Sequence, residues 1–298
     1  MRALILALSL SVTTAFAQSL PVKLHDGDTW TFTAKHERLS DGPRSHDYTV
    51  TITKTLTWRA ASDGAGGLLM EHVGSVAEPG TAPEAAATQT LTIPIKFTVD
   101  DALAPNGVVN VDEVRAATRK LLTDTGVTET DFQQMIKASP GILDQTAMTL
   151  ISRELGLLGR IQGTNLKKDL PVYQEDEVPN PIGGPPLRSR ITYELLDYDA
   201  DYGRAVINWK AEVDLVSLRD SLAELVNSVA QDQRAEAQAQ LAKMKLEIVR
   251  MCRGDIDIAS GLATKLICRN RTAVTEDGNV SQTFDRWEIT QSLPGKPQ

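Results

Sequence analysis

The sequence has few of the residues that usually carry out catalysis. Its 298 residues include two cysteines and four histidines, His25, His36, His46 and His72. None of these histidines has a second ligand or an acid at the spacing of a metal site, and the motifs His-Glu-x-x-His, Gly-x-Ser-x-Gly, Gly-x-Gly-x-x-Gly and the Walker loop do not occur. We therefore expect a non-enzymatic protein without a cofactor. A hydrolase whose catalytic residues meet only in the fold is the alternative.

Positive charge and long apolar runs are also scarce. Lys and Arg number 31 against 39 Asp and Glu, which gives a formal net charge of -8. This balance disfavours nucleic acid and anionic lipid surfaces as partners, because both favour clusters of Lys and Arg. The main apolar run, residues 3–12, is shorter than the roughly 20 residues that span a bilayer, so we expect no transmembrane segment in the mature chain.

The first residues have the features of a cleavable secretory signal. Arg2 supplies a positive charge, the apolar run follows, and Ala15 and Ala17 are small residues at the positions that define cleavage. We expect residues 1–17 to be a signal peptide that is removed, leaving a mature chain that starts near Gln18 in the periplasm or outside the cell. An uncleaved signal anchor is the alternative.

Export to an oxidising compartment predicts that Cys252 and Cys268 form a disulfide. Both cysteines lie in strand-like segments that flank a short loop ending at Gly261, a residue suited to a tight hairpin turn. If Ile258 pairs with Leu262, the register places the two cysteines directly opposite each other. Closing the loop between them would stabilise the fold by about 3 kcal/mol in the chain-entropy model.

The alternation of apolar and polar residues predicts an α+β fold with antiparallel strands. We expect a β-rich N-terminal half, residues 18–166, with a helical insert at 111–159. A C-terminal antiparallel half, residues 187–298, is expected to contain a helix at 217–243. Residues 167–186 are acidic and then rich in Pro and Gly, so we expect a connector, a lid or a domain boundary there.

Two architectures fit this pattern. The halves could be two similar units of β-hairpin plus helix, as the repeated Leu-Pro-Val at 20–22 and 170–172 indicates. Alternatively, one continuous curved antiparallel sheet is covered by the helices.

Aromatic residues on predicted strand faces are the candidate binding residues. They are Trp30, Phe32, Tyr48, Trp58, Tyr193 and Trp209. A curved sheet could line an apolar groove with these side chains. Ordinary core packing is the alternative, because alternating strand residues must be buried against something.

The candidate metal site is a turn with three closely spaced carboxylates. Asp197, Asp199 and Asp201 could converge on Ca²⁺. The positions where an EF-hand loop needs Gly and Glu hold Tyr202 and Asn208, so a plain polar hairpin turn is favoured and no metal is expected.

Over most of its length the chain also resembles known proteins in shape and in a few turn residues. Gly27-Asp28-x-Trp30, the helical insert, and Gly254-Asp255-x-Asp257 with Ser260-Gly261 at its turn resemble exported, sheet-rich bacterial proteins of uncharacterised families. The architecture is similar to that of periplasmic lipoprotein carriers, whose curved antiparallel sheet holds an apolar ligand against helices. Together with the export signal and the missing catalytic motifs, the curved-sheet pattern makes a non-enzymatic binding or carrier protein for a hydrophobic small molecule, a lipid or a lipidated partner the leading hypothesis. An envelope structural or protein-interaction module is the alternative, and the resemblance assigns no functional residues.

Overall fold

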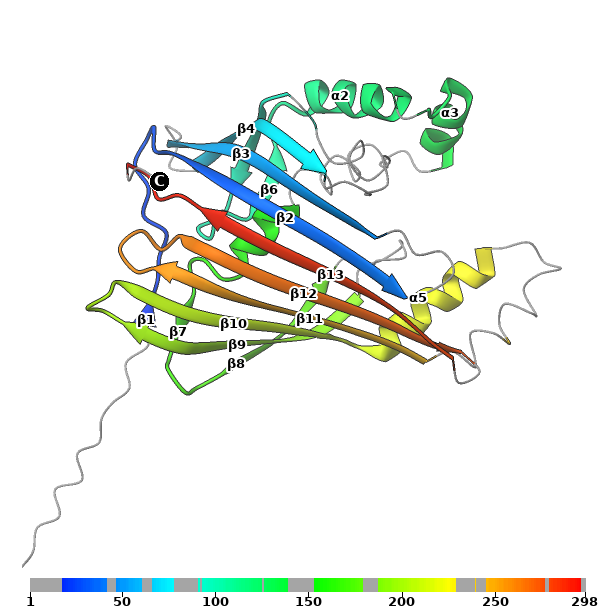
Figure 1. Ribbon diagram of the computed structural model, residues 1–298. Helices are drawn as coiled ribbons and strands as arrows, with labels where there is room; N and C mark the ends of the chain where they lie inside the picture. The colour runs from blue at the N-terminus through cyan, green and yellow to red at the C-terminus, as the bar shows by residue number, and fades with distance from the viewer. Residues whose placement is uncertain are drawn as a thin grey trace, which may run out of the picture.

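One antiparallel sheet of eleven strands dominates the computed structural model (Figure 1). The structure describes residues 18–41, 47–60, 66–77, 91, 93–124, 126–138, 153–178, 187–228, 239, 245–276 and 279–295. The expected signal peptide, and parts of the expected helical insert, connector and last helix, lie outside these residues. The α+β class with antiparallel strands is confirmed.

The chain builds the sheet as two meanders that meet in the middle. The first meander runs outward through β2 (Thr29–Asp41), β3 (Tyr48–Ala60), β4 (Gly66–Ala77), β5 (Ile95–Val99) and β6 (Pro105–Val108). The second returns from the other edge through β8 (Val172–Val178), β9 (Leu187–Asp199), β10 (Arg204–Val213), β11 (Lys245–Asp257), β12 (Ala263–Glu276) and β13 (Asn279–Gln291). β13 pairs with β2, so the strands of both halves form one continuous sheet. A separate short pair joins β1 (Gln18–Ser19) to β7 (Asn165–Leu166).

Strand β8 differs from the expectation for residues 167–186. Seven of these residues form a strand rather than a connector. β8 is the last strand of the sheet, so the charges of Glu175 and Glu177 stay in solvent at an edge, where acidic residues also discourage unwanted pairing.

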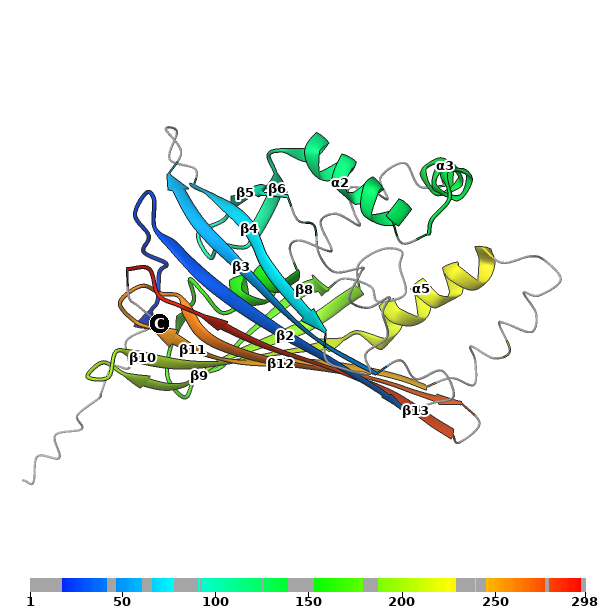
Figure 2. The same cartoon turned by 45° about the horizontal axis from the view of Figure 1, so that its top comes forward.

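The helices lie on one side of the sheet, as the two views of Figures 1 and 2 show. They are α2 (Val111–Asp124), α3 (Glu129–Ala138), a further helical stretch at 153–159, and α5 (Leu215–Ser228). Helix α5 begins earlier than expected because Asp214 caps it, accepting the backbone N–H groups of Val216 and Ser217 at 3.1 and 3.2 Å. No helix among the described residues is long and apolar enough to cross a membrane.

The face of the sheet beneath these helices is called the packed face here. Its fully buried residues include Phe32, Ala34, Ile52, Ile207, Leu266 and Ile289. Their neighbours in the chain point to the opposite, solvent face, where Glu37 forms ion pairs with Lys35 and Arg286 at 3.0 Å. This alternation confirms the period of two that the sequence shows.

The predicted disulfide is present and lies on the packed face. Cys252 and Cys268 are direct cross-strand partners in β11 and β12, with their Cα atoms 4.0 Å apart. The predicted pairing of Ile258 with Leu262 is wrong. A bulge after Asp255 shifts the register near the turn, so the N–H of Asp257 donates to the carbonyl of Leu262 instead.

Close packing fixes how the helical stretch at 153–159 and its continuation meet the sheet. Ile161 is fully buried and lies over Gly254 of β11, where a Cβ atom would stand 2.0 Å from the Cδ1 atom of Ile161. Only glycine leaves room for this contact. The sheet therefore accepts the helical stretch because one strand residue has no side chain.

We expect Gly254→Ala to lower the free energy of unfolding by about 1–3 kcal/mol, the usual cost of overpacking a core. Gly74→Ala is the matched control, since no atom lies within 4 Å of its Cβ position in β4, and we expect a change of less than about 0.5 kcal/mol. Urea denaturation measures both. Ile161→Val combined with Gly254→Ala should recover part of the loss, and equal stability of the two alanine variants would contradict the contact.

Candidate functional site

Cross-strand pairing places a continuous row of side chains across the packed face, called the disulfide row here. From β9 to β3 it consists of Tyr193, Trp209, Cys252, Cys268, Trp287, His36 and Val50. The ring of His36 stacks on that of Trp287, with the ring centres 3.6 Å apart. The row joins seven strands through side chains that lie directly opposite one another.

The helical stretch at 153–159 crosses this row, and an arginine at each end of it stacks on a tryptophan. The guanidinium of Arg153 lies 4.1 Å from the ring centre of Trp287, and that of Arg160 lies 5.0 Å from the ring centre of Trp209. The two tryptophans are three strand spacings apart, roughly 14 Å. The stretch is therefore attached at both ends by cation–π contacts, with the disulfide between them.

The next row along the strands is polar. It consists of Arg250, Asn270, Asp285, Arg38 and Tyr48, each two residues from a member of the disulfide row, and it is called the polar row here. Period-two alternation keeps these residues on the packed face. The polar row lies one step nearer than the disulfide row to the end of the sheet where α5 follows β10 (Figure 1). From β11 to β3 the packed face thus changes from apolar to polar within one step along the strands, whereas β9 and β10 continue with the buried Ile191 and Ala211.

Asp285 is the centre of the hydrogen bonds in this row. Its carboxylate accepts two hydrogen bonds from Arg38, at 2.8 and 3.1 Å, and one from Nε2 of His36 at 3.0 Å. A neutral His36 that donates from Nε2 has a lone pair on Nδ1, which the hydroxyl of Tyr48 reaches at 3.3 Å. Tyr48, His36 and Asp285 therefore form a relay across β3, β2 and β13.

The pKa values show what this relay can do. Burial alone would raise the pKa of Asp285, but the hydrogen bonds from His36 and Arg38 and the charge of Arg38 outweigh it and lower the pKa to about 2. Burial lowers the pKa of His36 below 6.5 and raises the pKa of Tyr48 above 10.0. A tyrosine nucleophile would need the opposite shift in Tyr48. Neutral Tyr48 and His36 thus act as a hydrogen-bonded clamp that holds the charged Asp285–Arg38 pair on the sheet.

A second buried charge cluster lies beside the first. Glu154 and Lys54 are almost completely buried, and their charged groups lie 3.2 Å apart. Arg153 approaches the same carboxylate at 3.2 Å. Burial opposes ionisation, but the charges of Lys54 and Arg153 lower the pKa of Glu154 below its usual 4.5. Arg153 therefore connects the two clusters, because it also lies over Trp287.

All six aromatic residues predicted to line a groove lie on the packed face, but they do not form one site. Trp30, Phe32 and Trp209 are at most 2% exposed, within the hydrophobic core. Trp58 is half-buried and lies opposite Leu68, far along β3 from the disulfide row. The other two, Tyr48 in the polar row and Tyr193 in the disulfide row, are half-buried.

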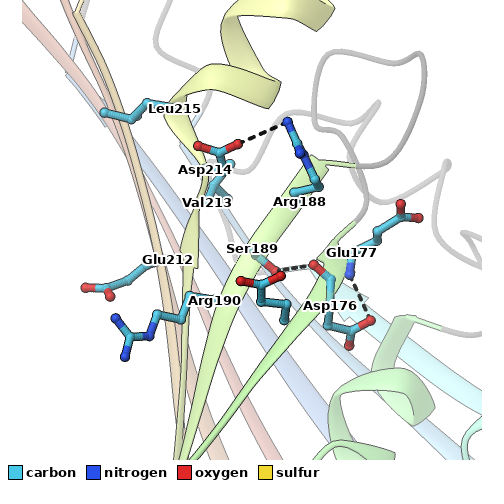
Figure 3. Close-up of a pocket in the computed structure, with 10 residues that line it drawn as sticks. Asp176, Glu177, Arg188, Ser189, Arg190, Glu212, Val213, Asp214 and Leu215 are labelled. Atoms are coloured by element: carbon cyan, nitrogen blue, oxygen red, sulfur yellow. Dashed lines mark hydrogen bonds and ion pairs between the residues drawn. The ribbon is translucent and has the colours of Figure 1, made fainter.

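A cavity of about 690 Å³ lies near the β8 edge of the sheet, between β8, β9, β10 and the start of α5 (Figure 3). The residues around it are Glu175, Asp176, Glu177, Arg188, Ser189, Arg190, Glu212, Val213, Asp214 and Leu215. Arg188 pairs with Asp214 at 3.6 Å, and the hydroxyl of Ser189 donates to the carbonyl of Asp176 at 3.2 Å. Its charged lining contains none of the six predicted aromatic residues.

The turn proposed for calcium is held together by one of its own carboxylates. Asp199 accepts the backbone N–H groups of Asp201 and Tyr202 at 3.1 and 3.0 Å, and Asp197 lies 3.6 Å from the amine of Lys168. In the part of the chain that the structure describes, no group of three or more His, Cys, Asp or Glu side chains could hold a metal ion.

Sequence reasoning missed the polar row and the arginines above it. Asp285 and His36 are about 250 residues apart, and only the register between β13 and β2 brings them together. One local signal was available. Arg38 continues the alternation of Phe32, Ala34 and His36 in β2, so a charged residue stands where an apolar one is expected.

Comparisons with known proteins give the fold and little more. No protein-family model and no curated protein matches the chain. A structure of lipovitellin that describes its lipid–protein interactions aligns with 93% of this chain at a TM-score of 0.50 and 9% identity. The chain spans 26% of that lipovitellin chain. DynF from the dynemicin biosynthesis pathway of Micromonospora chersina aligns with 99% of this chain and 94% of its own at 8% identity. Its TM-score of 0.21 is too low to indicate a shared fold.

We expect acid to destabilise the protein in two steps. The pKa of His36 lies below 6.5, so the unfolded chain binds this proton first, and stability falls as the pH drops below about 6.5. The pKa of Asp285 is about 2 instead of 3.8, so its charged form contributes about 2 kcal/mol above pH 4, which is lost as the pH falls from about 4 to 2.

Urea denaturation across this pH range measures both steps. His36→Gln should flatten the upper step and Asp285→Asn the lower one, while Asp201→Asn, at an exposed residue of the Asp199 turn, should change neither. If Asp285→Asn kept the pH profile of the parent protein, the assigned pKa would be wrong.

Proposed function

We propose that this protein is an exported carrier that holds an amphipathic ligand, a lipid or a lipidated partner on the packed face of its sheet, between the disulfide row and α5. The observation that supports this most is the change along the packed face from fully buried apolar rows to the half-buried polar row. A face that serves only as a core has no need of arginines, because burying charge costs free energy. A ligand with both apolar and polar parts would use both kinds of surface.

The aromatic side chains at this boundary support the same proposal. Tyr48 and Tyr193 are half-buried and combine an apolar ring with a polar end. Trp287 lies between them in the disulfide row, beneath Arg153. Such side chains are favoured where an apolar environment meets a polar one.

The fold likeness to lipovitellin supports a ligand of the lipid class, since that structure was described for its lipid–protein interactions. Fold alone does not identify a ligand, so the proposal depends on the side chains of the packed face. The disulfide between Cys252 and Cys268 supports the exported location, because such bonds persist in oxidising compartments.

An envelope protein-interaction module is the second candidate, and the edge strand β8 supports it. β8 is the end strand of the sheet and pairs with β9 on one side. Its residues Glu175, Asp176 and Glu177 would suit a basic partner strand added to this edge. Capture of a protein by cross-linking from Glu175 in cells, together with no lipid binding, would favour the module over the carrier.

We expect a brominated fatty acid to quench the tryptophan fluorescence of delipidated protein, because bromine quenches at short range and Trp287 lies beside the proposed site. Trp287→Phe should remove part of the quenching, because Trp209 lies in the same row and remains. Trp58→Phe is the matched control, since Trp58 lies on the same face but far from the disulfide row. It is eight residues along β3 from Val50, the member of that row in β3, and this spacing is roughly 27 Å.

Fluorescence titration measures this effect, and native mass spectrometry of protein purified without detergent gives an independent readout through bound lipid. Absence of quenching, or quenching lost equally in Trp287→Phe and Trp58→Phe, would overturn the proposed site. Circular dichroism melts check that both variants are folded.

A further inference from the structure

The two edges of the large sheet are protected to different degrees. At one edge, β6 has four residues and begins with Pro105, which lacks a backbone N–H. At the other edge, β8 has seven residues, contains no proline and pairs with β9 on one side. The outer side of such a strand presents a row of unpaired N–H and C=O groups, to which another strand can be added. In the part of the chain that the structure describes, the sheet therefore has one blunted edge and one open edge.

Strand β8 is also exposed on both faces. Residues 172–177 are all exposed, although every second one of them belongs to the packed face. In β9, by contrast, Ser189 and Ile191 are buried, and they lie opposite the exposed Asp176 and Gln174 of β8. The described part of the chain thus covers β9 but leaves β8 exposed, so a further strand can approach β8 from solvent.

Two carboxylates on the solvent face of β8 lack an ion-pair partner among the described residues. Glu175 and Glu177 lie directly opposite Arg190 and Arg188 of β9. Both arginines make other contacts, because the guanidinium of Arg190 lies 4.8 Å from the ring centre of the tyrosine in β8, and Arg188 pairs with Asp214 at 3.6 Å (Figure 3). Cationic side chains on an added strand would lie next to both glutamates.

The cavity of about 690 Å³ at this end of the sheet gives such side chains room. Five carboxylates line it, and three of them already have cationic partners. The other two are Glu175 and Glu177, on the strand that forms the edge. With Arg190 and the three partners counted, five carboxylates face four cations, so the site remains negative. A basic strand is therefore favoured at this edge.

The same charges disfavour a second copy of this chain as the added strand. If β8 paired with itself in full antiparallel overlap, the central residue Glu175 of one chain would lie opposite Glu175 of the other. Like charges directly opposite each other destabilise a strand pair. The edge therefore selects a strand of different composition.

We infer that β8 is a docking edge for an extended segment of another protein, which adds to the sheet as an antiparallel strand and carries basic residues at two alternate positions. Residues two apart lie on one face, so the solvent face of β8 presents Glu177, Glu175 and then Tyr173, which is 56% exposed. An antiparallel partner meets them in that order. Its sequence, read from its N-terminus, is therefore basic-x-basic-x-apolar, with the apolar side chain against Tyr173.

This inference rests on the second candidate function, to which it adds the chemistry of the partner, and it is compatible with the carrier. The added strand extends the sheet beyond β8, whereas the proposed lipid site lies on the packed face. A carrier could thus hold its ligand while it docks another protein. Quenching of tryptophan by lipid tests the carrier separately, so failure of the docking edge leaves the carrier function standing.

Hydrogen exchange of the full chain, followed by mass spectrometry, tests the docking edge. The probe is a capped peptide of seven residues, the length of β8, with the sequence Thr-Lys-Thr-Lys-Thr-Ile-Thr. We expect an excess of this peptide to slow the exchange of the outward-pointing β8 amides at least about fivefold, because strand pairing protects backbone N–H groups. The amides of β6, at the other edge, are the internal control and should not change.

Two further peptides separate the contributions of charge and backbone. Glutamate in place of both lysines should abolish the protection, because like charges then face each other. N-methylation of two neighbouring residues removes one N–H from each side of the peptide strand and should also abolish the protection. Equal protection by all three peptides would overturn the proposal.

Glu175→Gln and Glu177→Gln should each weaken binding of the lysine peptide by about two- to fivefold, as exposed ion pairs predict, and the loss should shrink in high salt. The matched control is Glu71→Gln, which removes the same charge from an exposed residue of β4, inside the sheet. Melting curves confirm that each variant is folded. If the double variant at Glu175 and Glu177 bound the peptide as tightly as the parent does, the assigned contacts would be wrong.

The protein without peptide gives the last arm of the test. Slow exchange of the β8 amides in this sample would contradict the proposal, because the edge would already be filled by the chain itself or by a second copy. Protection that rises with protein concentration would identify the second copy as the occupant and overturn the choice of a basic partner.

Discussion

The pairing of β13 with β2 is the constraint on which the rest of the structure depends. It joins two meanders that would otherwise be separate sheets, and it runs over ten residue pairs between Gln282 and Gln291 on one side and Phe32 and Asp41 on the other. The stack of His36 on Trp287 and the hydrogen bonds of Asp285 all cross this boundary. The polar row is therefore a product of the long-range pairing and exists only when both halves are folded.

Charge within the packed face sets this protein apart from an ordinary sheet covered by helices. A buried ion pair is weak evidence for stability, because the cost of removing two charges from water offsets most of their attraction. Lys54 with Glu154 and Arg38 with Asp285 are thus poorly explained as stabilising devices alone. Each acid does fix the position of a neighbouring arginine or lysine on the packed face.

Local features of the fold were predictable and non-local ones were not. Alternation in β2 and β3, the cysteine hairpin and the absence of familiar catalytic motifs follow from residues near one another in the chain. The acidic residues 172–178 look like a connector because nothing local shows that they end a sheet. Predicting the polar row would require the register between strands about 250 residues apart in the sequence. Predicting the stacking of Arg153 on Trp287 would also require the position of the helical stretch relative to those strands.

The position of β13 in the sheet also limits the order in which the strands can pair during folding. The β11–β12 hairpin forms between segments that are close in the sequence. Strand β2, near the start of the described chain, can complete its pairing only when β13, near the end, has been added. Contacts between such distant segments form slowly, because the loop between them must be closed first. Until then one side of β2 is an unpaired edge with its backbone groups exposed, the kind of surface that holding chaperones protect and that aggregation exploits. A chain that lacked its final strand would keep that edge permanently open.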